Sequence, residues 1–244
     1  MFKEQGRRFL YKAHAVGASG TFTKPHAEHL EAQASCALSI HGGMASGRVE
    51  NFNHRDIVRF RAAYTQAIGT FDPLSHSWNT LVTATVEGLN IQNVVTADRI
   101  VARLASHHFV YEREASILTL GSHIENLKVA GQVVDCEPDI DVMREWDTMT
   151  KVREGCKDRK PFAPSADGHR IHTSILRNVD CKGMHPKYNN AIHFPEFGTI
   201  HLGEIIISDG ERRLTMVRVE FGCETDGDGN FGEVTGNGVP MPPF

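Results

Sequence analysis

The chain has 244 residues, of which 40% are hydrophobic and 23% are charged. This composition is close to that of an average globular protein, which excludes a disordered, collagen-like or coiled-coil chain. Twenty-six basic residues against thirty acidic ones give a net charge of −4, so no overall basic field favours nucleic acid as a partner.

Apolar and polar residues alternate with a period of two along much of the first half of the sequence, which is the pattern of a half-buried strand. We expect such strands at 30–41, 78–86 and 100–104. The segment 57–71 alternates in the same way, although its alanine-rich centre would also accept a helix. We interpret it as a fourth strand.

One segment has a helical period instead. After Pro138, apolar residues recur every three positions from Ile140 to Met149, Asp139 can cap the first turn, and Gly155 can end the run. The sequence therefore predicts one amphipathic helix near 139–154 whose apolar stripe is docked on the sheet.

The segment 156–198 is rich in proline, glycine and polar residues, and only 171–176 could form a short strand. We expect a long loop here, either a lid or a linker, so that 138–198 forms a helix-plus-loop insertion. Next, alternating runs at 200–207 and 214–221 flank Asp209-Gly210, a pair that favours a tight hairpin turn. The residues 224–244 are rich in glycine and proline and predict a tail that lies on the surface or extends into a neighbouring subunit.

Short strands separated by turns, with one helix, indicate a mainly β protein. We predict a single β domain over residues 1–244, built as an antiparallel β-sandwich or barrel. No apolar run approaches the roughly 18 residues that cross a bilayer, and the first residues lead into no signal-type segment. Together with five widely spaced cysteines and no C-x-x-C pair, this predicts a cytoplasmic protein with reduced thiols and no membrane partner.

Fourteen histidines are an unusually large share, and histidine serves both proton transfer and metal binding. Five of them and two glutamates lie within 36 residues: His169, His172, His185, His193, Glu196, His201 and Glu204. No known ligand spacing is matched, so we expect either no cofactor or a divalent metal held by loop histidines. In a regular strand, His201 and Glu204 would face opposite sides unless a bulge intervenes at Gly203. His107 and His108 follow an Arg/Ser stretch that we expect to be exposed.

Candidate acids lie on the predicted strands. If 94–104 is one regular strand, Asp98 shares a face with Ile100 and turns inward, where burial would raise the pKa of its carboxyl group. Alternatively, Asp98 lies in an exposed turn. Glu87 ends the neighbouring strand. We predict that His172, His185 or His193 meets Asp98 or Glu87 over a cavity, where these five residues perform acid–base catalysis.

Two functions follow from these features. The first is a small-molecule enzyme of the lyase, isomerase or cyclase type, with acid–base groups at the mouth of the barrel or sandwich. The second is a non-catalytic β module that binds a partner or assembles into a homo-oligomer. The sequence leaves open whether the chain is an enzyme.

Overall fold

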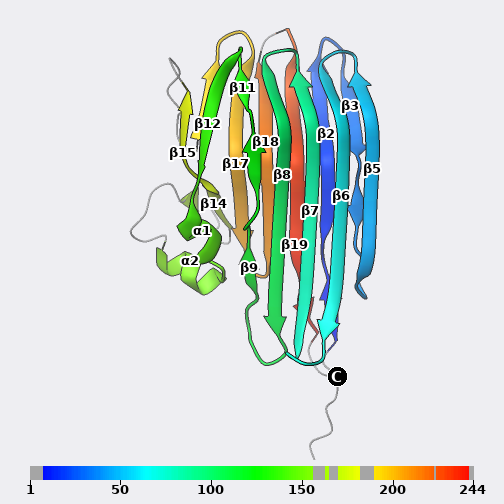
Figure 1. Cartoon of the computed structure of the whole chain (residues 1–244), viewed down its shortest axis with the longest axis vertical. Helices are drawn as coiled ribbons and strands as arrows, with labels where there is room; N and C mark the ends of the chain where they lie inside the picture. Colours follow the sequence, from blue (N-terminus) through cyan, green and yellow to red (C-terminus); the bar gives the residue numbers. More distant parts are fainter. Residues whose placement is uncertain (1–7, 156–162, 165–169, 182–189, 223, 242–244) are drawn as a thin grey trace, which may run out of the picture.

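The structure is a computed structural model, which describes residues 8–155, 163–164, 170–181, 190–222 and 224–241. Its strands form two antiparallel sheets that pack face to face, as Figure 1 shows. The two sheets remain separate, so the predicted mainly β fold is confirmed and, of its two alternatives, the sandwich is the one observed. None of the helices in the described ranges has the length and apolar character that crossing a bilayer requires.

The first sheet contains the central strands of the C-terminal half together with strands from the N-terminus. In spatial order its main path is β13 (Ala163–Pro164), β14 (Arg170–Ser174), β17 (Gly198–Ser208), β18 (Glu211–Gly222), β19 (Asp226–Pro240), β2 (His14–Lys24) and β3 (Glu28–Gln33). Three short strands pair with it: β1 (Phe9–Tyr11) with β19, β4 (Cys36–Ala37) with β2, and β16 (Ala191–Phe194) with β17.

The second sheet is built mainly from the middle of the chain. Its main path is β15 (Leu176–Cys181), β12 (Gln132–Pro138), β11 (Lys128–Val129), β8 (Val95–Phe109), β7 (Ser77–Ile91), β6 (Val58–Asp72) and β5 (Gly43–His54). The short strands β9 (Ser116–Leu118) and β10 (His123–Glu125) pair with β8.

The core lies between the sheets, where β19 covers β7 and β8 and where β2 covers β6 and β7. Its largest completely enclosed apolar side chains include Phe231, Leu104 and Ile200. Each such side chain contributes about 1.5–3 kcal/mol relative to an exposed one, which makes this seam the main source of stability.

The strands predicted at 57–71, 78–86 and 100–104 are confirmed within β6, β7 and β8, and the hairpin around Asp209-Gly210 is confirmed between β17 and β18. The strand predicted at 30–41 is only partly correct. It divides into β3 and β4 because the backbone turns at Ala34, whose φ is +49°.

Both sheets carry a row of backbone irregularities at one level, which we call the kink row. In register across the first sheet it comprises Gly203, Met216, Gly232 and Gly17, and across the second sheet Asn51, Arg61, Gly88 and Asp98. In each sheet two of the four have positive φ: Gly203 (+63°), Gly232 (+65°), Asn51 (+53°) and Gly88 (+65°).

At the kink row the inward face of a strand changes phase. On β8, Val95 and Ala97 are buried before the row, and Ile100 and Ala102 are buried after it. Two consecutive residues, Asp98 and Arg99, are therefore exposed. A strict period of two cannot represent this change.

The prediction of one helix over 139–154 is wrong, because two short helices occupy the segment: α1 (Ile140–Arg144) and α2 (Met149–Gly155). Asp139 caps the first as expected, accepting hydrogen bonds from the backbone N–H groups of Asp141 and Val142. The helix is interrupted between α1 and α2 because the backbone carbonyls there accept hydrogen bonds from the sheets. The carbonyl of Trp146 accepts from Arg212, and that of Asp147 accepts from the N–H of Ile117.

The long loop predicted at 156–198 is also incorrect where the structure describes it. Residues 170–174 and 176–181 form β14 and β15, which extend opposite sheets, and the chain crosses between them at the fully buried Ile175. These strands and both helices lie together at one side of the sandwich (Figure 1).

The surface tail predicted at 224–244 is wrong as well, because 226–240 form the central strand β19. Its glycines reflect close packing within the sheet. A Cβ on Gly227 would lie 2.0 Å from the carbonyl oxygen of Thr21, and one on Gly238 would lie 2.4 Å from that of Leu10.

Candidate functional site

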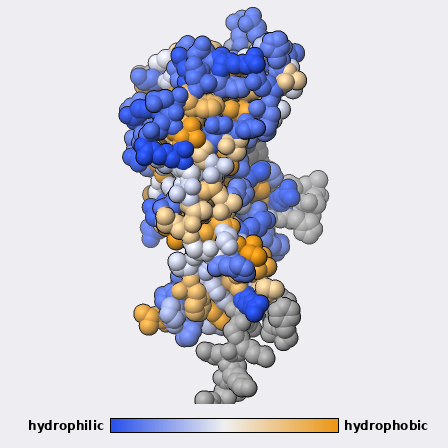
Figure 2. All heavy atoms as spheres, turned by 90° about the vertical axis from the view of Figure 1, so that its right-hand side faces the viewer, coloured by the Kyte–Doolittle hydropathy of each residue, from blue (hydrophilic) through white to orange (hydrophobic). Residues whose placement is uncertain are grey.

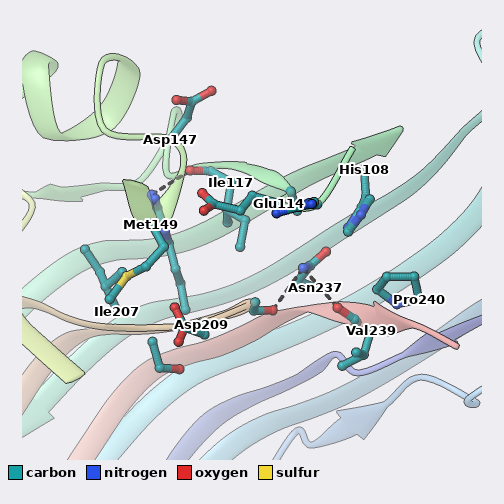
Figure 3. A pocket seen from close by; sticks show the side chains of 16 residues that line it. His108, Glu114, Ile117, Asp147, Met149, Ile207, Asp209, Asn237, Val239 and Pro240 are labelled. Atoms are coloured by element: carbon teal, nitrogen blue, oxygen red, sulfur yellow. Dashed lines mark hydrogen bonds between the residues drawn. The ribbon is translucent and has the colours of Figure 1, made fainter. Parts of the chain in front are cut away.

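A cavity of about 400 Å³ opens at the end of the sandwich where β8 and β19 finish, beside the segment that joins α1 to α2 (Figure 3). Its volume falls within the range of small-molecule sites. Apolar side chains line part of the wall, namely Ala115, Ile117, Met149, Ile207, Val239 and Pro240. The polar wall includes His108, Arg113, Glu114, Asp147, Asp209, Arg212 and Asn237.

Arg212 is the most unusual of these residues, because its side chain is only 2% exposed. Its position at the start of β18 turns it inward, in phase with the buried Leu214. Its guanidinium donates to the backbone carbonyl of Ile117 at 2.6 Å and to that of Trp146. Burial lowers the pKa of Arg212 to about 10 against the opposing effect of nearby Asp147, so the group is a buried cation at neutral pH.

His108, near the end of β8, is also 2% exposed and lies against the rings of Phe9 and Trp78. Its Nε2 is 3.2 Å from the backbone carbonyl of Glu112. Because a carbonyl can only accept, Nε2 carries the proton and Nδ1 keeps its lone pair. Burial lowers the pKa of His108, outweighing the bond to Glu112, and Nδ1 has no hydrogen-bond partner among the described residues.

Asn237, on β19, adds a second buried acceptor. Its Nδ2 donates to the carbonyls of Gly210 at 2.9 Å and Gly238 at 3.1 Å, which fixes the orientation of the amide. The other amide atom, Oδ1, is buried and has no partner in the described part of the chain. In Figure 3 the amide lies between these carbonyls and the side of the cavity on which His108 is found.

The three carboxylates of the cavity wall are engaged elsewhere. Glu114 accepts from the backbone and hydroxyl of Thr150, and these bonds lower the pKa of Glu114. Asp147 accepts from Ser116 at 2.6 Å and from Lys151 at 2.7 Å.

Burial alone would raise the pKa of Asp147, but these two bonds outweigh it and lower the pKa. The third carboxylate, Asp209, pairs with Arg153 at 3.2 Å. None of the three makes a hydrogen bond to Arg212 among those described.

Chemically, the cavity joins a neutral imidazole with a free lone pair, a buried cation and an unpartnered amide oxygen. A group of this kind can accept a proton, stabilise negative charge and orient a polar ligand against an apolar wall.

The structure places the predicted acids outside this cavity. Asp98 is exposed and accepts from Asn126 Nδ2 at 2.6 Å, so the expectation that it turns inward is wrong, and the kink row is the reason. Glu87 pairs with the exposed Arg61 at 3.1 Å.

The two predicted histidines that the structure describes are on the other sheet. His172 lies on β14, on the side opposite the buried Ile171, and His193 is exposed on β16, 3.3 Å from the hydroxyl of Thr199. His185 lies outside the described residues. The structure thus does not bring the four described residues together around one cavity. Their catalytic role stays a prediction.

The register between β17 and β18 shows no bulge at Gly203, but the positive φ of Gly203 changes the phase of β17. This change puts His201 Nδ1 3.5 Å from Glu204 on the outer face of the first sheet. Arg218 occupies both oxygens of Glu204, at 2.5 and 2.9 Å. Within the described ranges, no group of three or more His, Cys, Asp or Glu residues could hold a metal ion. Two of the predicted ligands, His169 and His185, are outside these ranges.

His108, Arg212 and Asn237 are site residues that the sequence patterns did not predict. His108 is buried and not exposed. The sequence pattern could have indicated this, because Ile100, Leu104 and His108 are separated by even numbers of residues and so point to the same, inward face of β8. No local pattern marked Asn237, because its burial depends on the unexpected strand β19.

The fold and cavity define an antiparallel β-sandwich protein with a partly apolar cavity at one end, lined in part by buried polar side chains. Residues 9–162 match a protein family described as "Domain of unknown function (DUF8256)". This match covers more than half of the chain, which therefore belongs to that family. The matched region contains His108 and Asp147, whereas Arg212 and Asn237 lie beyond it. No curated protein and no solved structure matches the chain.

Proposed function

We propose that the chain is a small-molecule enzyme of the lyase, isomerase or cyclase type, and that its active site is the cavity at the end of the sandwich. The observation that carries the proposal is the convergence of three buried polar side chains from three different strands. The cavity is lined by His108, whose Nδ1 has no described partner, by the cation Arg212 and by the amide residue Asn237.

The proposed chemistry begins with proton transfer from carbon. His108 Nδ1 takes a proton from a carbon next to a carbonyl group, and the electron pair of the C–H bond moves onto the carbonyl oxygen. Arg212 stabilises the negative charge that develops. Return of the proton to another carbon gives an isomerase, and departure of a leaving group with its electron pair gives a lyase.

Neither unpartnered atom contacts solvent in this closed arrangement. A substrate therefore displaces neighbouring side chains as it enters, which is consistent with the exclusion of water that such chemistry needs. The free thiol of Cys36 supports a reducing, cytoplasmic location as part of the same proposal.

Deuterium exchange tests the proposed proton transfer without knowledge of the full reaction. The protein is incubated in D₂O with small ketones, β-keto acids and 2-hydroxy acids, and loss of the proton next to the carbonyl is followed by NMR. We expect at least one compound to exchange, with a rate about 10²–10⁴-fold lower for His108→Gln.

His107→Gln is the matched control. His107 is the chain neighbour of His108, is half-buried on the opposite face of β8 and contacts Asn79 at 2.5 Å. It should retain the wild-type exchange rate. The proposal fails if no compound exchanges, or if His108→Gln exchanges as fast as the wild type.

A second candidate function, non-catalytic self-assembly, is favoured by one edge of the second sheet. The 12-residue strand β5 has only β6 as a neighbour on the sheet path. Ile40, which precedes this strand, is 55% exposed, and Met44, which lies within it, is 68% exposed. Figure 2 faces this side of the molecule and shows apolar atoms along its middle. Long open edges are templates for pairing with another strand.

We propose a second copy of the chain as the occupant of this edge. If two β5 strands paired antiparallel about Val49, Arg48 of each copy would face Glu50 of the other, which is a favourable cross-strand pair. Light scattering should then show a dimer that Glu50→Arg weakens and that the double variant Arg48→Glu/Glu50→Arg restores. A wild-type monomer at all concentrations would contradict self-assembly.

A further inference from the structure

Within the described part of the chain, the buried cation of the cavity has no carboxylate in hydrogen-bond or ion-pair contact. In its described hydrogen bonds, Arg212 donates to two neutral backbone carbonyls, those of Ile117 and Trp146. An arginine fork has five N–H donors and matches a carboxylate with two parallel hydrogen bonds. A buried cation is costly unless it is paired, so this site favours an anion from outside the chain.

The carboxylates around the cavity do not meet this need. Asp147 is held by Lys151 and Ser116, and Asp209 is held by Arg153. A second cation, Arg113, is exposed on the cavity wall and has no ion pair among the described residues. The third carboxylate, Glu114, is held by the backbone N–H and hydroxyl of Thr150. Arg212 and Arg113 are therefore cations of the cavity that no described carboxylate contacts directly.

The cavity also contains acceptors that a carboxylate cannot satisfy. Asn237 Oδ1 and His108 Nδ1 are both buried without a described partner, and both require a hydrogen-bond donor. A hydroxyl group on the ligand supplies one. The apolar wall around Ile117, Met149 and Val239 suits a hydrocarbon or aromatic body.

From these three features we infer that the cavity binds a small hydroxy-carboxylate with an apolar body. Arg212 holds the carboxylate, and Asn237 or His108 accepts from the hydroxyl group. The inference rests on the proposed function, since it names the substrate class of the same site. It does not require that catalysis occur, because the ligand can bind to Arg212 and Asn237 without transfer of a proton to His108.

The test is calorimetric titration with three probes of nearly equal size: mandelate, phenylacetate and phenylacetamide. We expect mandelate to bind most tightly, phenylacetate about tenfold more weakly for want of the hydroxyl group, and phenylacetamide at least a further tenfold more weakly for want of the charge. Equal binding of the acid and the amide would overturn the role of the carboxylate.

Variants assign the charge recognition to its residue. Arg212→Met should weaken mandelate at least 30-fold and remove the preference for acid over amide. Arg212→Lys keeps the charge without the fork and should recover part of the affinity, which keeps the test informative if the Met variant does not fold. Arg213→Met is the matched control, because Arg213 is the exposed chain neighbour on the opposite face of β18 and should bind as the wild type does.

The outcomes separate this inference from the proposed function. If mandelate binds through Arg212 but no compound exchanges deuterium, the inference stands and the enzyme proposal fails. If a neutral ketone exchanges through His108 while acids bind no better than amides, the enzyme proposal stands and the inference fails. Absence of binding by all three probes, or unchanged binding by Arg212→Met, overturns the inference.

Discussion

Replacing Gly232 by alanine tests the packing of the two sheets at the kink row. Gly232 has a φ of +65°, a conformation that costs an L-residue with a side chain about 1–2 kcal/mol. The new Cβ would also lie 3.1 Å from Ile100 Cγ2 on the opposite sheet. Overpacking of a rigid core adds about 1 kcal/mol at the mild end of its range, so we expect a total loss of about 2–3 kcal/mol.

Gly210→Ala separates the two contributions. Gly210, in the β17–β18 turn, has a similar φ of +72°, but its Cβ would meet nothing closer than the carbonyl oxygen of Gly238 at 3.9 Å. Gly210→Ala should therefore lower the free energy of unfolding only by the backbone contribution, about 1–2 kcal/mol.

Urea unfolding of both variants, with unchanged m-values, measures the difference. In a chain of this size Gly232→Ala should lower the Tm by about 4–12 °C, and Gly210→Ala should lower it by about 2–8 °C. A Gly232→Ala variant no less stable than Gly210→Ala would refute close packing of the sheets at this level.

Three further predictions concern ionisable and capping groups. Because the native pKa of His108 is lowered, the unfolded state binds more protons below about pH 6.5, so stability falls as the pH drops from there through the native pKa. His108→Gln should lose this component, as urea unfolding at pH 5 and pH 7 will show. Asp139→Ala removes the cap of α1 and should cost about 1 kcal/mol in the same assay, whereas Asp139→Asn should cost less. Arg218→Met should cost about 1–2 kcal/mol because Glu204 loses both of its hydrogen bonds, and an unchanged free energy of unfolding would contradict a stabilising role for this pair.

Much of the fold could be predicted from local patterns. Alternation identified β6, β7 and the middle of β8 because each has one face in a continuous core over most of its length. Asp209-Gly210 identified the β17–β18 hairpin because positive φ at Gly210 is compatible with very few residue types.

The parts that failed depend on tertiary contacts. Asp98 was misplaced because positive φ at Gly88 and its neighbours in the kink row changes the phase of every strand together, which no single strand reveals. The strand β19 was mistaken for a tail because its glycines are required by neighbouring strands rather than by turns.

The candidate site escaped prediction for a related reason. His108, Arg212 and Asn237 come from three strands, and their meeting depends on the pairing of β18 with β19 and on the packing of β19 over β8. The histidine content of the segment 169–204 led to the prediction of a site there. The described histidines of this segment lie on the outer face of the first sheet or beside it.

The ¹⁵N spectrum of the histidine side chains at pH 7, recorded before and after addition of mandelate, addresses the proposed site most directly. We expect His108 to be neutral, with Nε2 protonated and Nδ1 bare, and we expect the Nδ1 resonance to shift on addition of mandelate in the wild type but not in Arg212→Met. A His108 that is protonated at pH 7 would contradict its assignment as the base of the proposed active site. An Nδ1 resonance that no hydroxy-carboxylate moves would contradict binding of this ligand class beside His108.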